Sequence, residues 1–285
     1  MSPPDHASTP CLNCGAPITG RFCSACGQKV PRPNPTLREF LHDVTEELIH
    51  WDGKIPSSLI VLFTVPGQLT RDFLQGRRAR WLPPLRLYLI CSIAYFASVP
   101  MMEAITHRQA KAAIRFGLTT TAPAQMTAED RAEVDSSVFT RLIGKERIDR
   151  ILANPVEVQN SFARSFPKAM FVLLPLFAWL TSLAYRKTVP HYPAHLYFAL
   201  HEHAAAFGAL TVSKVATLAG STTVDVIAGL AALIYIGWHG LRAARLVFGG
   251  SAGGTVAKAV AVGLAYWVFF VIVTALLIGY AFASI

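Results

Sequence analysis

The sequence predicts an all-α polytopic membrane helix bundle of about five spans, with a small N-terminal four-cysteine zinc ribbon. Three observations lead to this fold class. Of the 285 residues, 53% are hydrophobic and only 15% are charged, whereas soluble domains carry about a quarter charged residues. The apolar residues gather in runs of roughly 18 or more that are nearly free of charge, the length that crosses a bilayer. Four of the five cysteines form two Cys-x-x-Cys pairs near the N-terminus.

The formal net charge of +9 does not indicate a nucleic-acid-binding protein. Lys and Arg gather at the ends of the apolar runs instead of forming one basic stripe, which is the charge distribution of a membrane protein. We therefore expect a lipid bilayer as the main partner and no nucleic acid. The first 36 residues are polar and rich in proline, so no signal peptide is expected.

Residues 1–28 are predicted to form the zinc ribbon, whose ligands are Cys11, Cys14, Cys23 and Cys26. Each pair lies on a tight turn followed by a glycine, and two such turns supply the four thiolates of a closed tetrahedral zinc site. Cysteines used in this way indicate a reducing compartment without disulfides. Since a closed site leaves no open coordination position, we expect no catalysis at this zinc. The ribbon then either recruits a partner, senses metal or redox state, or serves only as a structural element.

Residues 29–83 are predicted to lead from the ribbon into the membrane. A Pro-rich linker covers 29–35, and an amphipathic helix begins at Thr36 but is too polar to span. The apolar segment Ile55–Phe63 is too short to cross a bilayer, so both segments are interpreted as interfacial or re-entrant. The alternative is a small soluble helical subdomain that packs on itself.

Residues 84–285 are predicted to form the membrane domain, with an extracytoplasmic loop over 106–167 that contains a helical stretch at 137–152. The five spans are expected at about 84–105, 168–185, 196–218, 224–238 and 256–283. An odd number of spans places the two termini on opposite sides.

Orientation follows from the basic residues of the short connections. All of them fall on one side if the N-terminus is cytoplasmic: Arg77, Arg78, Arg80 and Arg86 before the first span, Arg186 and Lys187 after the second, and Arg242, Arg245 and Lys258 between the last two. The opposite side has only a short AGSTTVD turn and the C-terminal residues. We therefore expect a multi-pass protein of the inner membrane with a cytoplasmic N-terminus.

Several polar side chains fall inside the predicted spans, where they are costly and call for a functional hypothesis. The candidate intramembrane site consists of His195, Glu202, His203, Lys214 and Asp225, with His201 and His239 nearby. At 100° per residue, one straight helix cannot aim its three histidines at one ion. A metal or proton site would therefore need His195, Glu202 and His203 plus a ligand such as His239 or His191. The alternative is hydrogen bonding between helices, with Lys214 and Asp225 pairing across a helical hairpin.

The segment from Pro66 to Leu89 (PGQLTRDFLQGRRARWLPPLRLYL) resembles a bacterial membrane-protein family known as domain of unknown function 3667. The matching positions are Pro66, Gly67, Arg71, Gly76, Arg77, Arg78, Trp81 and Pro84. The resemblance continues through the ribbon and the segments 173–187 and 195–207. It implies an integral membrane protein with a cytoplasmic ribbon but no established activity. Glu202 departs from the pattern, since an apolar residue is expected there.

These observations lead to a membrane-anchored binding, scaffold or sensor protein, with a protein partner engaged by the zinc ribbon. The second hypothesis is a small-solute or ion transporter that uses the polar residues of spans three and four. The third is a membrane-embedded metalloenzyme built on the histidines of span three. No nucleophile, base and acid occur in a recognisable motif, so an enzyme is the less favoured class. A homo-oligomer is compatible with the sequence.

Overall fold

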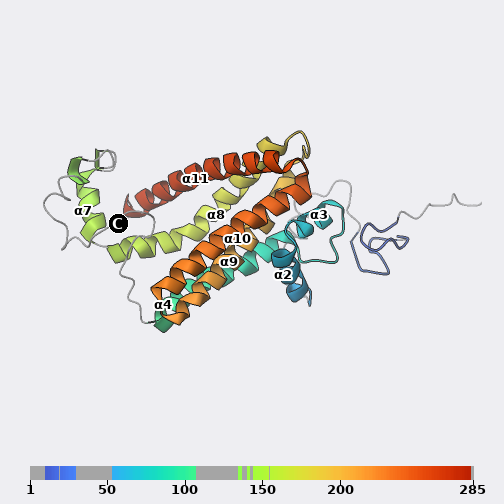
Figure 1. Ribbon diagram of the computed structural model, residues 1–285, viewed down its shortest axis with the longest axis horizontal. Helices are drawn as coiled ribbons and strands as arrows, with labels where there is room; N and C mark the ends of the chain where they lie inside the picture. Colours follow the sequence, from blue (N-terminus) through green and yellow to red (C-terminus); the bar gives the residue numbers. More distant parts are fainter. Residues whose placement is uncertain are drawn as a thin grey trace, which may run out of the picture.

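The computed structural model (Figure 1) describes residues 10–18, 20–29, 53–106, 134–136, 140–141, 144–153 and 155–283. Throughout these ranges the chain is helical, apart from turns and two isolated β-bridges in the N-terminal cysteine module. The helix predicted from Thr36 lies outside the described residues. Of the stretch predicted to be helical at 137–152, the structure gives the helix α7 (Lys145–Ala153).

Four helices are long and apolar enough to cross a membrane, judged by length and composition. They are α4 (Pro84–Thr106), α8 (Pro155–Tyr185), α10 (Thr222–Phe248) and α11 (Ala252–Ala283). Their apolar windows cover Pro84–Met102, Phe166–Tyr185, Thr222–Phe248 and Ala252–Leu277. The predicted all-α bundle is thereby confirmed, as are the positions of four of the five expected spans.

The third expected span, 196–218, forms the helix α9 (Tyr192–Ala216), which is continued by the short 3₁₀ turn η2 (Thr217–Ala219). Its 25 residues give a length of about 37 Å, enough for a crossing. However, α9 is not among the helices apolar enough for a span. The reason is local, because His201, Glu202 and His203 interrupt its apolar sequence.

The polar helix α9 lies at the centre of the bundle and the apolar helices lie around it. It packs against α4, α8 and α10 and extends along the bundle beside them (Figure 1). Two of its histidines, His195 and His201, are buried. The outermost helix is α11, which packs mainly against α8 and buries only Thr255 and Val262 of its residues Ala252–Leu277. Protein therefore surrounds the long helix whose sequence falls short of a span, whereas the most apolar of the long helices, α11, is left largely exposed.

Two short helices precede the first long helix at one end of the bundle: α2 (Ile55–Thr64) and α3 (Gln68–Leu74). Between them the chain reverses at Gly67, whose φ of 83° lies in the left-handed region. A Cβ atom built on Gly67 would lie 2.8 Å from the Cα of Ala243 in α10. The turn thus requires glycine for its backbone conformation and also for its close approach to α10.

The helix α2 packs against the bundle and not on itself, which argues against a separate soluble subdomain. Its buried residues are Ser58 and Leu62, and Leu62 belongs to the main apolar core together with residues of α4, α8 and α9. The carbonyl of Leu62 meets His239, nine residues before the end of α10 at Phe248. The span in α10 was expected to end at Trp238, so this contact lies beside the expected end of the span. The interfacial and the re-entrant interpretation of α2 both stay predictions.

Candidate metal centre and buried polar network

The N-terminal cysteine module consists of two copies of the same turn. In the first, the Cys11 amide donates to the Ala16 carbonyl at 2.8 Å and the Gly15 amide donates to the Cys11 carbonyl at 2.8 Å. In the second, the Cys23 amide donates to the Gln28 carbonyl at 2.9 Å, and the Gly27 amide donates to the Cys23 carbonyl at 2.8 Å. Gly15 and Gly27 have φ angles of 78° and 72°, as expected for glycines that close such turns. Cys11 therefore corresponds to Cys23, and Ala16 corresponds to Gln28.

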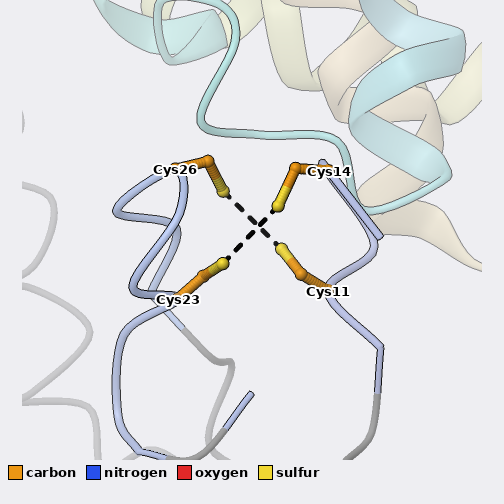
Figure 2. A group of neighbouring side chains, drawn as sticks. All are labelled: Cys11, Cys14, Cys23 and Cys26. Atoms are coloured by element: carbon orange, nitrogen blue, oxygen red, sulfur yellow. Dashed lines mark hydrogen bonds between the residues drawn. The ribbon is translucent and has the colours of Figure 1, made fainter. Parts of the chain in front are cut away.

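The four thiols of these turns face one another (Figure 2), and their sulfur atoms all lie within 4.8 Å. The Sγ atoms of Cys11 and Cys26 are 3.7 Å apart, and those of Cys14 and Cys23 are 3.5 Å apart. A disulfide needs a separation of about 2.05 Å, so the thiols are free. Four sulfurs tetrahedrally placed about 2.3 Å from zinc are about 3.8 Å apart. The four cysteines thus fit a tetrahedral metal ion.

Polar neighbours favour the thiolate form at one of these cysteines. Two hydrogen bonds lower the pKa of Cys26 to about 6. The larger effect comes from the Asn13 side chain, and the smaller one from the Gln28 backbone. A thiolate is the form that ligates metal. Of the residues that the structure describes, only Cys11, Cys14, Cys23 and Cys26 form a group of three or more His, Cys, Asp or Glu placed to hold a metal ion.

The cysteine module contacts the membrane domain through Gln28. The Gln28 side chain donates from Nε2 to the Gly76 carbonyl at 2.8 Å, and its Oε1 accepts from the amides of Arg78 and Ala79 at 3.0 and 3.1 Å. These partners lie in the elbow, by which we mean residues 75–83 between α3 and α4. The Leu12 side chain also contacts the elbow. A Cβ atom built on Gly76 would lie 2.5 Å from the Cδ1 atom of Leu12.

The elbow is in turn fixed by Asp72, a fully buried acid in α3. Its carboxylate accepts from the Trp81 indole at 2.8 Å and from the Gln68 amide at 2.9 Å, and the Arg77 guanidinium lies 3.6 Å away. The Arg77 backbone amide also donates to the Asp72 carbonyl at 2.9 Å. One buried carboxylate therefore holds both sides of the elbow.

Deeper in the bundle, side chains of α10 satisfy the carbonyl groups at the end of α2. His239 Nε2 donates to the Leu62 carbonyl at 2.8 Å, and the Tyr235 hydroxyl donates to the Phe63 carbonyl at 2.9 Å. The other ring nitrogen of His239 lies 3.0 Å from Glu202 Oε2. A helix leaves its last carbonyls without partners, and a lipid environment offers no water to replace them. The predicted polar site thus includes a helix-capping arrangement, in which Glu202 pairs with His239.

The remaining histidines of α9 have separate partners. His201 Nδ1 lies 2.9 Å from the Thr70 hydroxyl in α3, and His203 Nε2 lies 2.9 Å from the Tyr266 hydroxyl in α11. His195 Nε2 lies 2.9 Å from the Val189 carbonyl. The described contacts therefore do not bring His195, Glu202 and His203 together around a shared ion. His201 and His203 hydrogen-bond to other helices, whereas His195 contacts the connection that precedes α9.

Lys214 and Asp225 lie at the other end of the bundle, in the last turn of α9 and the first turn of α10. Asp225 is buried, and its backbone amide donates to the Ser221 carbonyl at 3.0 Å. Their pairing stays a prediction.

Sequence reasoning missed Gln28, Asp72, Tyr235 and Tyr266. For Gln28, a comparison of the two turns would have revealed it, because alanine fills the equivalent position 16. For Asp72, the signal is its position as the one acidic residue among the arginines of residues 71–80. The two tyrosines carry no local signal, since their partners lie on helices far away in the sequence.

These features define the class: a multi-pass helical membrane protein with a four-cysteine metal site at one end. The comparison with protein families then adds a match over residues 52–96 to the family described as a protein of unknown function, DUF3667. The predicted resemblance is thereby confirmed over this segment, and its continuation through the ribbon and the segments 173–187 and 195–207 stays a prediction. The matched segment contains α2, the Gly67 turn, α3, the elbow and the first half of α4. No curated protein and no solved structure matches the chain.

Proposed function

We propose that this chain is a membrane-anchored binding or sensor protein of the inner membrane, whose zinc ribbon lies in the cytoplasm and engages a protein partner. The observation that carries the proposal is the grouping of the four thiols, whose sulfur atoms all lie within 4.8 Å of one another, in a module held against the end of a membrane bundle. Four thiolates select a soft ion that accepts tetrahedral geometry, and zinc is the usual one.

The distribution of basic residues supports the cytoplasmic placement. The ribbon contacts the elbow, which carries Arg77, Arg78 and Arg80. The end of α8 and the end of α10 meet at this side of the bundle, where Tyr185 stacks on Phe248 with ring centroids 4.3 Å apart. The remaining basic residues lie near these ends: Arg186 and Lys187 follow α8, Arg242 and Arg245 lie in the last two turns of α10, and Lys258 lies in the second turn of α11. The turn at 217–221 on the other side has none.

The buried polar side chains support an anchoring role for the membrane domain. Glu202, His203 and His239 each have a partner on another helix or at the end of α2. Contacts of this kind hold helices together in a bilayer. The specific observations thus favour an anchor over a pathway for solutes.

Metal content and partner retention test the proposal on the detergent-purified full chain. We expect about one zinc per chain, and Cys11→Ser or Cys26→Ser should remove it. The matched control is Cys91→Ser, because Cys91 is buried in α4 away from the cluster and its loss should leave the zinc in place. A partner that co-purifies with the wild type should be lost with both ligand variants and kept with the control. A metal-free wild type, or zinc retained by Cys11→Ser, would contradict the proposal.

A further inference from the structure

We infer that the elbow is the docking surface for the metal-loaded ribbon, and that Gln28 makes this docking depend on the metal. The inference rests on the proposed function in one respect, namely that the four cysteines bind a metal ion. It goes further by assigning a partner within the same chain to the ribbon, and by linking the metal to the segment that enters the first span.

The side chain of Gln28 is fully engaged by the elbow. It is 9% exposed, and its amide makes three hydrogen bonds, all to backbone groups of Gly76, Arg78 and Ala79. Because backbone groups are recognised, the contact depends on the conformation of the elbow and not on the identity of its side chains. Gly76, with a φ of 81°, provides that conformation and leaves room for Leu12.

The backbone of Gln28 belongs to the metal turn. Its carbonyl accepts from the Cys23 amide at 2.9 Å, and its amide donates to the Cys26 sulfur. The position of the side chain therefore depends on the geometry of two metal ligands. Within the described part of the module, each isolated bridge closes one turn, Pro10 with Pro17 and Phe22 with Lys29, and neither bridge joins the two turns. With so little other structure, the metal ion supplies most of the order.

The two turns of the module provide an internal comparison that separates docking from folding. Ala16 makes the same backbone contact with Cys11 that Gln28 makes with Cys23. The turn therefore forms without a glutamine at this position. The Gln28 side chain is needed for the elbow and not for the turn, so Gln28→Ala should leave metal binding intact.

Beyond the elbow, the contacts continue into the membrane domain. Asp72 joins the Arg77 amide and the Trp81 indole, and the Ser58 hydroxyl accepts from the Leu82 amide at 3.0 Å. Thr70, on the same short helix as Asp72, contacts His201 in the central helix. Release of the ribbon thus uncovers a segment that is directly tied to the helices of the bundle.

Hydrogen exchange of single backbone amides in the full-length protein, in detergent, tests the inference. In the zinc-loaded wild type the amides of Arg78 and Ala79 should be protected. Removal of zinc with a chelator should accelerate their exchange at least tenfold, and Gln28→Ala should do the same while about one zinc per chain is retained. The Arg77 amide is an internal reference, because its acceptor is Asp72 and its exchange should not change. Ser24→Ala, an exposed position on the same turn, is the matched control and should behave as the wild type.

The outcomes separate the two proposals. If the wild type binds no zinc, the proposed function fails. If it binds zinc, but Arg78 and Ala79 exchange at the same rate in the wild type, the chelated protein and Gln28→Ala, the docking inference is overturned and the metal site stands. Loss of zinc in Gln28→Ala would also overturn it, because the side chain would then serve the turn.

Discussion

At the scale of single residues, the ring of His239 is held between two acceptors. The Leu62 carbonyl can only accept, so Nε2 carries a proton. The second nitrogen faces Glu202, and one further proton lies between them, on the ring or on the carboxyl. The pair has no net charge in either case. A pair without net charge is compatible with burial, and it explains how a glutamate is accommodated in the central helix.

This arrangement predicts a difference between two substitutions of Glu202. Glu202→Gln keeps a donor for the second ring nitrogen of His239, so stability should stay within about 1 kcal/mol of the wild type. Glu202→Ala leaves that buried nitrogen without a partner and should lower the free energy of unfolding by about 1–3 kcal/mol. Denaturant unfolding in detergent measures both. Equal losses for the two variants would refute the shared-proton arrangement.

The sequence allowed the metal ligands to be predicted but not the partners of the histidines. Cysteine ligands follow a short, regular spacing, and the chemistry of thiolates narrows their use. Helical geometry indicates only that one straight helix cannot aim all three histidines of α9 at one ion, and it identifies no partner for any of them. Their partners depend on contacts between remote segments, with Thr70 and His201 131 positions apart and His203 and Tyr266 63 apart. Local periodicity contains no information about such pairs.

At the scale of elements, the turn at Gly67 predicts a specific weakness. Gly67→Ala places a side chain at a φ of 83° and against the backbone of Ala243. We expect a loss of stability of about 1–3 kcal/mol or more. Gly229→Ala is the control, since nothing lies within 4 Å of its Cβ position and helical alanine is favoured over glycine by up to about 1 kcal/mol. Thermal unfolding in detergent should separate the two variants, and similar midpoints would show that α10 can move away.

Helix positions could be predicted from hydropathy, but several boundaries could not. The span expected from Lys168 agrees with an apolar window that begins at Phe166, but its helix, α8, already begins at Pro155. Likewise, α10 continues past Trp238 to Phe248. In both cases the helix extends into polar sequence. Arginines such as Arg242 and Arg245 end an apolar run without ending a helix, because their long side chains reach the interface.

At the scale of the whole molecule, the central position of α9 predicts a fifth crossing. Reporters fused after residues 188 and 250 should lie on the side of the N-terminus, and reporters after 220 and 283 on the opposite side. If α9 stayed on one side, 188 and 220 would report the same compartment. That result would require four crossings and would bring both termini to the same side.

Sequence reasoning reached the bundle and the ribbon as separate parts, but not the way they join. Hydropathy of α9 alone falls short of a span because His201, Glu202 and His203 count as polar wherever they point. Only the packing of α4, α8 and α10 around it shows that these groups are shielded. Similarly, the contact between Gln28 and the elbow joins positions 48 to 51 apart.

Leu62 and His239 lie 177 positions apart in the sequence, so their contact forms late in the synthesis of the chain. The cysteine turns can take up metal soon after they leave the ribosome, since all their ligands lie within a short stretch. The carbonyls at the end of α2 must wait until α10 has been translated. We therefore expect the family-matched segment to enter the bilayer early and incomplete, and to become fixed only when the fourth long helix of the bundle arrives.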